Sequence, residues 1–235
     1  MENYKQRIYK AYVKNITNKY FSFSPLEYRT LCDEFDLNYA PFLPQEKTAR
    51  ILELGCGPGF LLYFLDHKGF PNYVGIDYSQ EQVDLAKANC KGDVVQGDFL
   101  EYLKTTKELF DLILARHVLE HFTKEEIFEI IDLMRAHLKP QGKLIVEVPN
   151  ASSPIYGSYT RYGDFTHEVS FTLESIEEVL MATDFEVAHS GPYIVKHAPK
   201  RILFSLLNRA LQVVAKTKIF FDISIFAVGV KKEEA

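Results

Sequence analysis

Short apolar runs alternate with amphipathic segments through the middle of the chain. The apolar runs predict strands at 51–54, 73–77, 94–96, 110–115 and 143–148. The segments between them predict helices at 60–67, after a capping box at Ser79, and from a second capping box at Thr123 to about residue 138. Strands that alternate with helices favour a parallel sheet with right-handed crossovers.

The pattern changes after Pro149. Residues 150–171 are polar and aromatic, and so long a connection predicts a functional loop. The remaining elements that we expect are a helix at 174–181, strands at 185–189 and 222–230, and an amphipathic helix at 201–214.

Composition narrows the class of protein. The chain has 235 residues, which suits one α/β domain (50–235) preceded by a helical extension (1–49). The net charge of −5 argues against nucleic-acid binding. Three cysteines without metal or CxxC spacing, and the lack of a signal peptide or long apolar run, predict a cytoplasmic protein without a bound metal.

A glycine-rich turn follows the first predicted strand. Gly55, Gly57 and Gly59 come after Glu53 in the pattern E-x-G-x-G-x-G. Glycine lets the backbone turn tightly and approach a ligand without an intervening Cβ. The dinucleotide fingerprint G-x-G-x-x-G needs glycine at position 60, where this chain has phenylalanine, so the spacing disfavours a nicotinamide cofactor. Asp77 ends the second strand, where a carboxylate can bind both ribose hydroxyls.

This turn resembles motif I of the class I S-adenosylmethionine-dependent methyltransferases. Residues 96–99 and 116–122 resemble two further segments of that family. The resemblance implies a Rossmann-like α/β fold with a seven-stranded, mostly parallel sheet, an antiparallel last strand and helices on both faces. It also implies S-adenosylmethionine as cofactor, S-adenosylhomocysteine as product, and cofactor-binding residues at Glu53, Gly55, Gly57, Gly59, Asp77, Tyr78, Asp98, Phe99 and Arg116.

Methyl transfer to a hydroxyl benefits from a general base. His167, in the predicted functional loop, is our first candidate for the base, and His117, after the fourth strand, is the second. We expect His121 to pack or cap the following helix. The loop also contains aromatic and charged residues suited to binding an acceptor, namely Tyr159, Arg161, Tyr162, Asp164 and Glu168.

The loop sequence R-Y-G-D-F-T-H-E-x-S-F-T resembles a signature of bacterial methyltransferases linked to sugar and polysaccharide modification. The resemblance implies O-methylation of a sugar or glycan-type acceptor. One alternative is an O- or C-methyltransferase of a quinone-like or phenolic small molecule. Another is a non-catalytic, cofactor-binding scaffold subunit.

Two segments keep more than one interpretation. The amphipathic segment at about 200–215 carries basic residues at its ends, including Arg201, Lys216 and Lys218. It favours packing on the core or a homodimer interface over peripheral contact with the inner membrane face. Near the N-terminus, the aromatic residues of 20–23 and Tyr28 suit either a lid over the cofactor or core packing.

Overall fold

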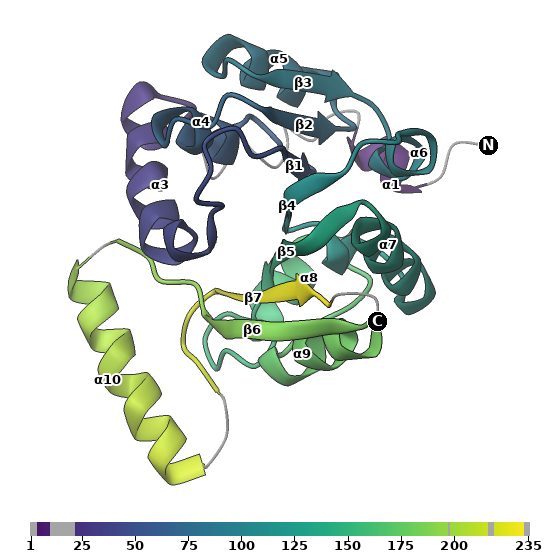
Figure 1. The fold of residues 1–235 in the computed structure, drawn as a ribbon. Coiled ribbons are helices and arrows are strands. Elements are labelled where there is room, and N and C mark those ends of the chain that lie inside the picture. The colour runs from purple at the N-terminus through teal and green to yellow at the C-terminus, as the bar shows by residue number, and fades with distance from the viewer. Residues whose placement is uncertain (1–3, 10–21, 197, 216–218, 233–235) are drawn as a thin grey trace. The chain divides into compact units, whose positions relative to one another are not determined.

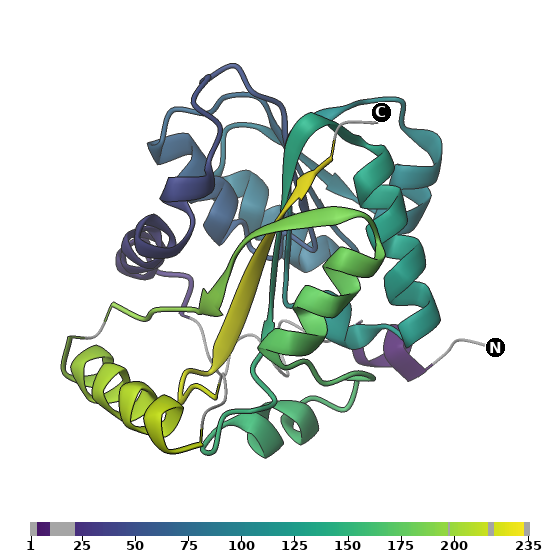
Figure 2. The same ribbon diagram turned by 60° about the horizontal axis from the view of Figure 1, so that its bottom comes forward.

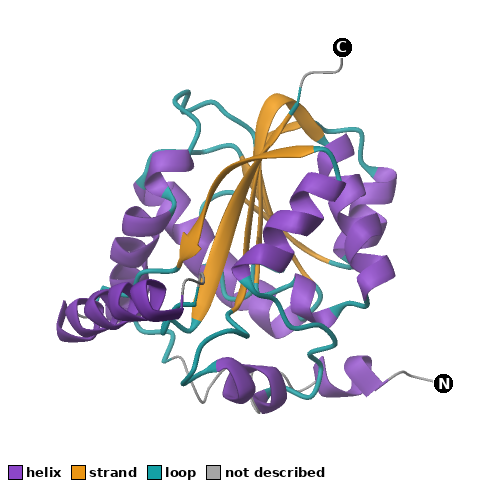
Figure 3. Cartoon of the chain, turned by 90° about the horizontal axis from the view of Figure 1, so that it is seen from below, coloured by secondary structure: helices purple, strands orange, loops and turns teal. Residues whose placement is uncertain are grey.

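The computed structural model describes residues 4–9, 22–196, 198–215 and 219–232. The chain divides into two compact units, Met1–Leu114 and Ala115–Ala235. Its strands form a seven-stranded sheet in the order β3-β2-β1-β4-β5-β7-β6. Between residues 51 and 116, helices and strands alternate along the chain. Figure 3 distinguishes the two kinds of element by colour. The predicted α/β class with a mostly parallel sheet is confirmed.

Three strands of the first unit run parallel. They are β1 (Ile51–Leu54), β2 (Tyr73–Asp77) and β3 (Asp93–Gln96), and Figure 1 shows them next to one another. The register pairs Glu53 with Gly75 and Asp77 with Gln96. Their carboxyl ends therefore meet at one edge of the sheet. The next strand, β4 (Phe110–Arg116), crosses the boundary between the units.

Side-chain caps at Ser24, Ser79 and Asp98 begin three of the described helices of the first unit. In chain order the helical segments are α1 (Tyr4–Tyr9), α3 (Pro25–Asn38), η2 (Ala40–Phe42), α4 (Phe60–His67), α5 (Gln80–Asn89) and α6 (Phe99–Thr105). Ser79 caps α5 as expected, accepting a hydrogen bond from the Gln82 amide. The sequence analysis missed α6, which Asp98 caps.

The glycine-rich turn between β1 and α4 needs its glycines for two different reasons. Gly55, Gly57 and Gly59 have φ values of 65°, 54° and 82°, a region that favours glycine. A Cβ on Gly59 would lie 2.7 Å from Cys90 Sγ, so the turn packs tightly there. A Cβ on Gly57 would meet only Gln82 Oε1, at 4.0 Å. The side of the Gly57 backbone from which a Cβ would project is therefore open to a ligand.

The segment before the first strand packs onto this turn. The Tyr28 hydroxyl donates a hydrogen bond to the Pro58 carbonyl at 2.7 Å, and the Tyr28 and Phe60 ring centroids lie 4.6 Å apart. Tyr28 is only 1% exposed. Its contacts are those of core packing, one of the two alternatives left open for this segment. Tyr20 and Phe21 lie outside the described residues.

The strands of the second unit are antiparallel neighbours. β7 (Ser224–Lys231) pairs antiparallel with both β5 (Leu138–Pro149) and β6 (Phe185–Pro192), so the prediction of an antiparallel last strand is confirmed. We predicted the start of β5 at residue 143, but the strand begins at Leu138. Pro140 is tolerated there because pairing with β7 begins only at Lys143.

The helices of the second unit are η3 (Leu119–His121), α7 (Lys124–Ala136), α8 (Gly157–Gly163), α9 (Leu173–Ala182) and α10 (Ala198–Ala215). Figure 2 shows α9 packed against β6. Thr123 and Thr172 form capping boxes at the starts of α7 and α9. The structure corrects the interpretation of 150–171 as one loop, because α8 lies within it. This helix has no apolar periodicity that could have predicted it.

One face of α10 packs within the second unit. Phe204 is buried beside Tyr156 and Phe221, and the Asn208 side chain donates to Asp222 Oδ2 at 2.8 Å. The other face is exposed and apolar, with residues Ile202, Leu206 and Val213. Lys216 and Lys218 lie outside the described residues. Within the part of the chain that the structure describes, no helix is long and apolar enough to cross a bilayer.

Gly59→Ala should lower the free energy of unfolding by about 2–5 kcal/mol, because left-handed strain adds to overpacking against Cys90 and Ala86. Gly69→Ala is the matched control. Gly69 also has a positive φ (77°), but a Cβ there meets nothing within 4 Å, so only strain of about 1–2 kcal/mol is expected. Equal losses in urea denaturation would contradict the role assigned to Gly59 in packing.

Candidate active site

Asp77 holds the glycine turn from the end of β2. Its carboxylate accepts hydrogen bonds from the Gly57 amide at Oδ2 and from the Ser79 amide at Oδ1, both at 2.8 Å. Burial raises the pKa of Asp77, and these two hydrogen bonds oppose that shift. Each oxygen keeps a second lone-pair direction for a ligand hydroxyl. The turn and the predicted ribose-binding carboxylate are thus one hydrogen-bonded unit.

The other predicted cofactor residues of the first unit lie on or directly after β1, β2 and β3. Glu53 is buried within β1, and Tyr78 is exposed after β2. Asp98 follows β3 and accepts a hydrogen bond from the Leu100 amide at 2.8 Å, directly before Phe99 begins α6. Arg116 is different, because it belongs to the second unit.

In the second unit, a backbone contact joins the η3 turn to the loop after α8. The Glu120 carbonyl accepts hydrogen bonds from the Glu168 amide at 2.7 Å and the Val169 amide at 3.2 Å. Arg161 supports the same loop by donating to the carbonyls of His167 and Glu168. These contacts bring His167 beside residues 120 and 121, far from it in sequence.

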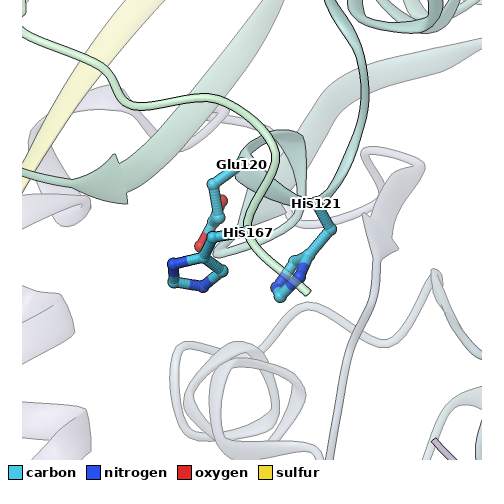
Figure 4. A group of neighbouring side chains, drawn as sticks. All are labelled: Glu120, His121 and His167. Atoms are coloured by element: carbon cyan, nitrogen blue, oxygen red, sulfur yellow. The ribbon is translucent and has the colours of Figure 1, made fainter. Parts of the chain in front are cut away.

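Glu120, His121 and His167 form a cluster that we call the EHH cluster (Figure 4). One potential ligand atom from each residue lies within 4.8 Å of the others. Glu120 is 2% exposed. The ring centroids of His121 and His167 lie 4.8 Å apart, in an edge-to-face arrangement. Partial burial lowers the pKa of His167, although Glu120 partly offsets this effect. His167 is therefore mainly neutral at pH 7 and able to accept a proton.

Asp164 and Thr166 orient His121. The Thr166 hydroxyl donates to Asp164 Oδ1 at 2.6 Å, and the Thr166 oxygen lies 2.8 Å from His121 Nδ1. Burial opposes ionisation of Asp164, but the hydrogen bonds from Thr166 outweigh it and lower its pKa. Asp164, predicted to bind the acceptor, thus has a clear supporting role within the loop.

His117 lies between two buried carboxylates. Its Nε2 is 3.1 Å from Glu147 Oε1, and its Nδ1 is 3.4 Å from Glu120 Oε1. Arg116 Nε binds the other oxygen of Glu147 at 2.7 Å. Partial burial favours the neutral ring, but Glu147 and Glu120 prevail and raise the pKa of His117 to about 9. His117 is therefore protonated at pH 7, with its backbone in the left-handed region (φ 52°).

A small pocket opens beside the EHH cluster, between the η3 turn, the end of β5, α8 and the loop after it. Its lining residues are Glu120, Pro149, Ala151, Gly157, Thr160, Arg161, His167, Val169 and Ser170. Of the five predicted acceptor residues, only Arg161 lines it. Tyr159 and Tyr162 on α8 and Glu168 in the loop are exposed.

The sequence analysis missed Glu120, Glu147 and Thr166. Two buried acids within or after apolar strands were a usable signal, because a carboxylate is rarely buried without a partner. Thr166 gave no such signal, since its importance depends on the fold of the loop around it.

A family model described as a methyltransferase domain matches residues 25–190. The range includes the glycine turn, Asp77 and the whole EHH cluster. The chain therefore belongs to the methyltransferase-domain family, and the predicted enzyme class is confirmed.

Curated relatives match part of the chain. The ubiquinone biosynthesis O-methyltransferase of Bartonella tribocorum is 30% identical over 131 residues, which cover 54% of this chain and 51% of the relative. The protein of the same name from Rickettsia akari is 29% identical, over 59% of each chain. The matches thus span about half the length of these relatives. Their name corresponds to the small-molecule alternative in our sequence analysis, and neither is named for a sugar acceptor.

Solved structures share the fold at low sequence identity. A SAM-dependent methyltransferase from Archaeoglobus fulgidus has a TM-score of 0.68 at 21% identity, covering 87% of this chain and 94% of the other. Magnesium protoporphyrin IX methyltransferase from Synechocystis, solved with bound SAM, has a TM-score of 0.62 at 14% identity and 99% coverage of both chains. The Rossmann-like methyltransferase fold is therefore confirmed.

The raised pKa of His117 predicts a loss of stability at alkaline pH. The charged ring stabilises the folded state fully below pH 6.5, the ordinary pKa, and this contribution is lost as the pH rises through about 9. We expect a loss on the order of 1 kcal/mol, because solvent screens a side chain that is 41% exposed.

Urea denaturation between pH 6 and pH 10 measures this loss. His117→Asn is the control, because asparagine also tolerates the left-handed backbone but does not titrate. The stability of the wild type should fall relative to that of the variant across this range. Parallel curves would contradict a charged His117.

Proposed function

We propose that this chain is an S-adenosylmethionine-dependent O-methyltransferase that acts on a hydroxyl of a quinone-like or phenolic small molecule. Family membership supports the reaction class, and the name of the curated relatives supports the acceptor class. The observation that carries the proposal is a mainly neutral His167 lining a pocket in the second unit. A sugar or glycan acceptor, our first prediction, keeps only the support of the loop signature.

The first unit fits the methyl donor. The backbone at Gly57 is open where a Cβ would otherwise project, and Asp77, which binds the Gly57 amide, is the proposed ribose ligand. The carboxyl group of Glu53 suits the donor's cationic amino acid group, and Asp98 with Phe99 would bind the adenine. When bound, S-adenosylmethionine supplies a methyl group on a sulfonium, and the C–S bond breaks as the acceptor oxygen attacks, releasing S-adenosylhomocysteine.

The second unit activates the acceptor. His167 accepts the proton of the acceptor hydroxyl, so that the oxygen electron pair is available for the methyl carbon. Of our two candidate bases, His167 is the better one, because His117 already holds a proton at pH 7. We assign His117 a positioning role, since its charge helps to keep the buried Glu120 ionised. Arg116 holds Glu147, and a direct cofactor contact of Arg116 stays a prediction.

The EHH cluster bears on the alternative of a non-catalytic, cofactor-binding scaffold subunit. A subunit without catalysis has no need for a neutral histidine beside a pocket, so the EHH cluster favours an enzyme. On α10, Phe204 and Asn208 pack within the second unit. Peripheral membrane contact and homodimerisation remain predictions for its exposed face, Ile202, Leu206 and Val213.

Calorimetric titration should show that S-adenosylhomocysteine binds the full chain at a single site. NADH should not bind, because the glycine spacing does not suit a pyrophosphate. His189→Gln, an exposed change on β6 of the second unit, serves as the control and should bind S-adenosylhomocysteine like the wild type. Tight binding of NADH without binding of S-adenosylhomocysteine would overturn the donor assignment.

His167→Asn should lower kcat by about 10²–10⁴-fold, because it removes the base. The affinity for S-adenosylhomocysteine should stay within about twofold, since His167 is no part of the proposed donor site. His189→Gln is a matched control, because His189 is an exposed histidine on β6 of the same unit. Single-turnover kinetics at saturating donor would measure the effect. Unchanged turnover in His167→Asn would refute the assigned role.

A further inference from the structure

We propose that the EHH cluster binds a divalent transition-metal ion of the Zn²⁺ type, with Glu120, His121 and His167 as its protein ligands. The sequence analysis predicted no bound metal. The three residues of the EHH cluster come from two segments that are far apart in the chain, so no metal-ligand spacing is visible in the sequence. The binding site stands on its own geometry. Its function in acceptor activation rests on the proposed methyl transfer.

The donor set of the cluster selects the metal. One carboxylate oxygen and two imidazole nitrogens lie within 4.8 Å of one another, so a modest closure would bring all three onto one ion. Two imidazoles favour zinc, iron, cobalt or nickel over magnesium and calcium, which prefer oxygen ligands. Three protein ligands also leave a coordination position for water or a substrate oxygen.

His121 is already oriented as a ligand. The hydroxyl proton of Thr166 goes to Asp164, so the Thr166 oxygen must accept the proton of His121 Nδ1. The neutral ring then carries its lone pair on Nε2. A hydrogen bond from the non-ligating nitrogen to a fixed acceptor is the usual support of a metal-bound histidine. Thr166 is fully buried, which makes this support rigid.

Glu120 provides the negative charge. It is 2% exposed, and within the described residues neither of its carboxylate oxygens accepts a hydrogen bond of good geometry. Its ion-pair contact with His117 Nδ1 is long, at 3.4 Å. A buried carboxylate is costly unless it is paired or coordinates a metal. Because Glu120 also lines the pocket with His167, an ion there would be open to a ligand.

A bound cation would change how the acceptor is activated. It would lower the pKa of a coordinated hydroxyl, whose proton would pass to solvent, so that the acceptor oxygen could attack the methyl carbon as the C–S bond of the donor breaks. His167 Nε2 or Nδ1, once it ligates the metal, no longer serves as base through that nitrogen. Turnover should therefore depend on added metal if a bound ion activates the acceptor, and it should not if His167 acts as the base.

Calorimetric titration of the chelator-treated full chain with Zn²⁺ alone tests the site without any methyl transfer. We expect one saturable site per chain and at least tenfold weaker binding of Mg²⁺. His167→Asn should weaken Zn²⁺ binding at least tenfold, and Thr166→Val should weaken it by about 10–100-fold through loss of the support for His121. The control His189→Gln should bind as tightly as the wild type.

The outcomes separate this inference from the proposed function. Lack of saturable binding by the folded wild type, or equal affinity in His167→Asn and His189→Gln, overturns the metal site. Turnover that persists without metal would then leave His167 as the base. Conversely, binding that depends on His167 in a chain with no methyltransferase activity would uphold the site while refuting the proposed function. Circular dichroism of each variant verifies its fold.

Discussion

The second unit depends on one backbone acceptor, the carbonyl of Glu120. Two successive amides of the loop after α8 donate to it, and this contact fixes the loop that carries His167. The side chains of Glu120 and His121 lie on the same short turn, so the contact that fixes the loop also assembles the EHH cluster. Further polar contacts extend from the EHH cluster. His121 contacts Thr166, which donates to Asp164, and Glu120 contacts His117, which also contacts Glu147. A polar network of this kind has a defined geometry only when all its members are held.

Much of the fold could be predicted from local signals. The bounds of β1, α4 and β2 agree with the apolar runs, and Ser79, Thr123 and Thr172 cap the helices that follow them. The errors occur where tertiary structure overrides local pattern. β5 begins before Pro140, which is tolerated there because pairing with β7 starts only at Lys143. Helix α8 has no apolar stripe. It begins at Gly157, which packs so tightly on the preceding segment that a Cβ there would lie 2.3 Å from the Ala151 carbonyl oxygen.

The two parts of the site differ in how far the sequence predicts them. The donor residues follow consecutive parallel strands, so strand order alone brings the turn and Asp77 to one edge. The acceptor site combines segments that are distant in sequence, and its chemistry depends on environment. His117 and His167 look equivalent as residues, yet two carboxylates raise the pKa of one while burial lowers that of the other. The family comparison confirms the enzyme class, and the acceptor rests on these second-unit residues and on the names of relatives.

The most direct test of the account is a transfer assay with methyl-labelled S-adenosylmethionine and the purified chain. Ortho-dihydroxyphenyl compounds with an apolar tail would be compared with a mixture of nucleotide sugars, followed by partition between organic solvent and water. The account predicts that label enters the organic phase in proportion to the S-adenosylhomocysteine formed, and only with the phenolic acceptors. Label confined to the sugars in the aqueous phase would contradict the proposed acceptor and restore the glycan prediction.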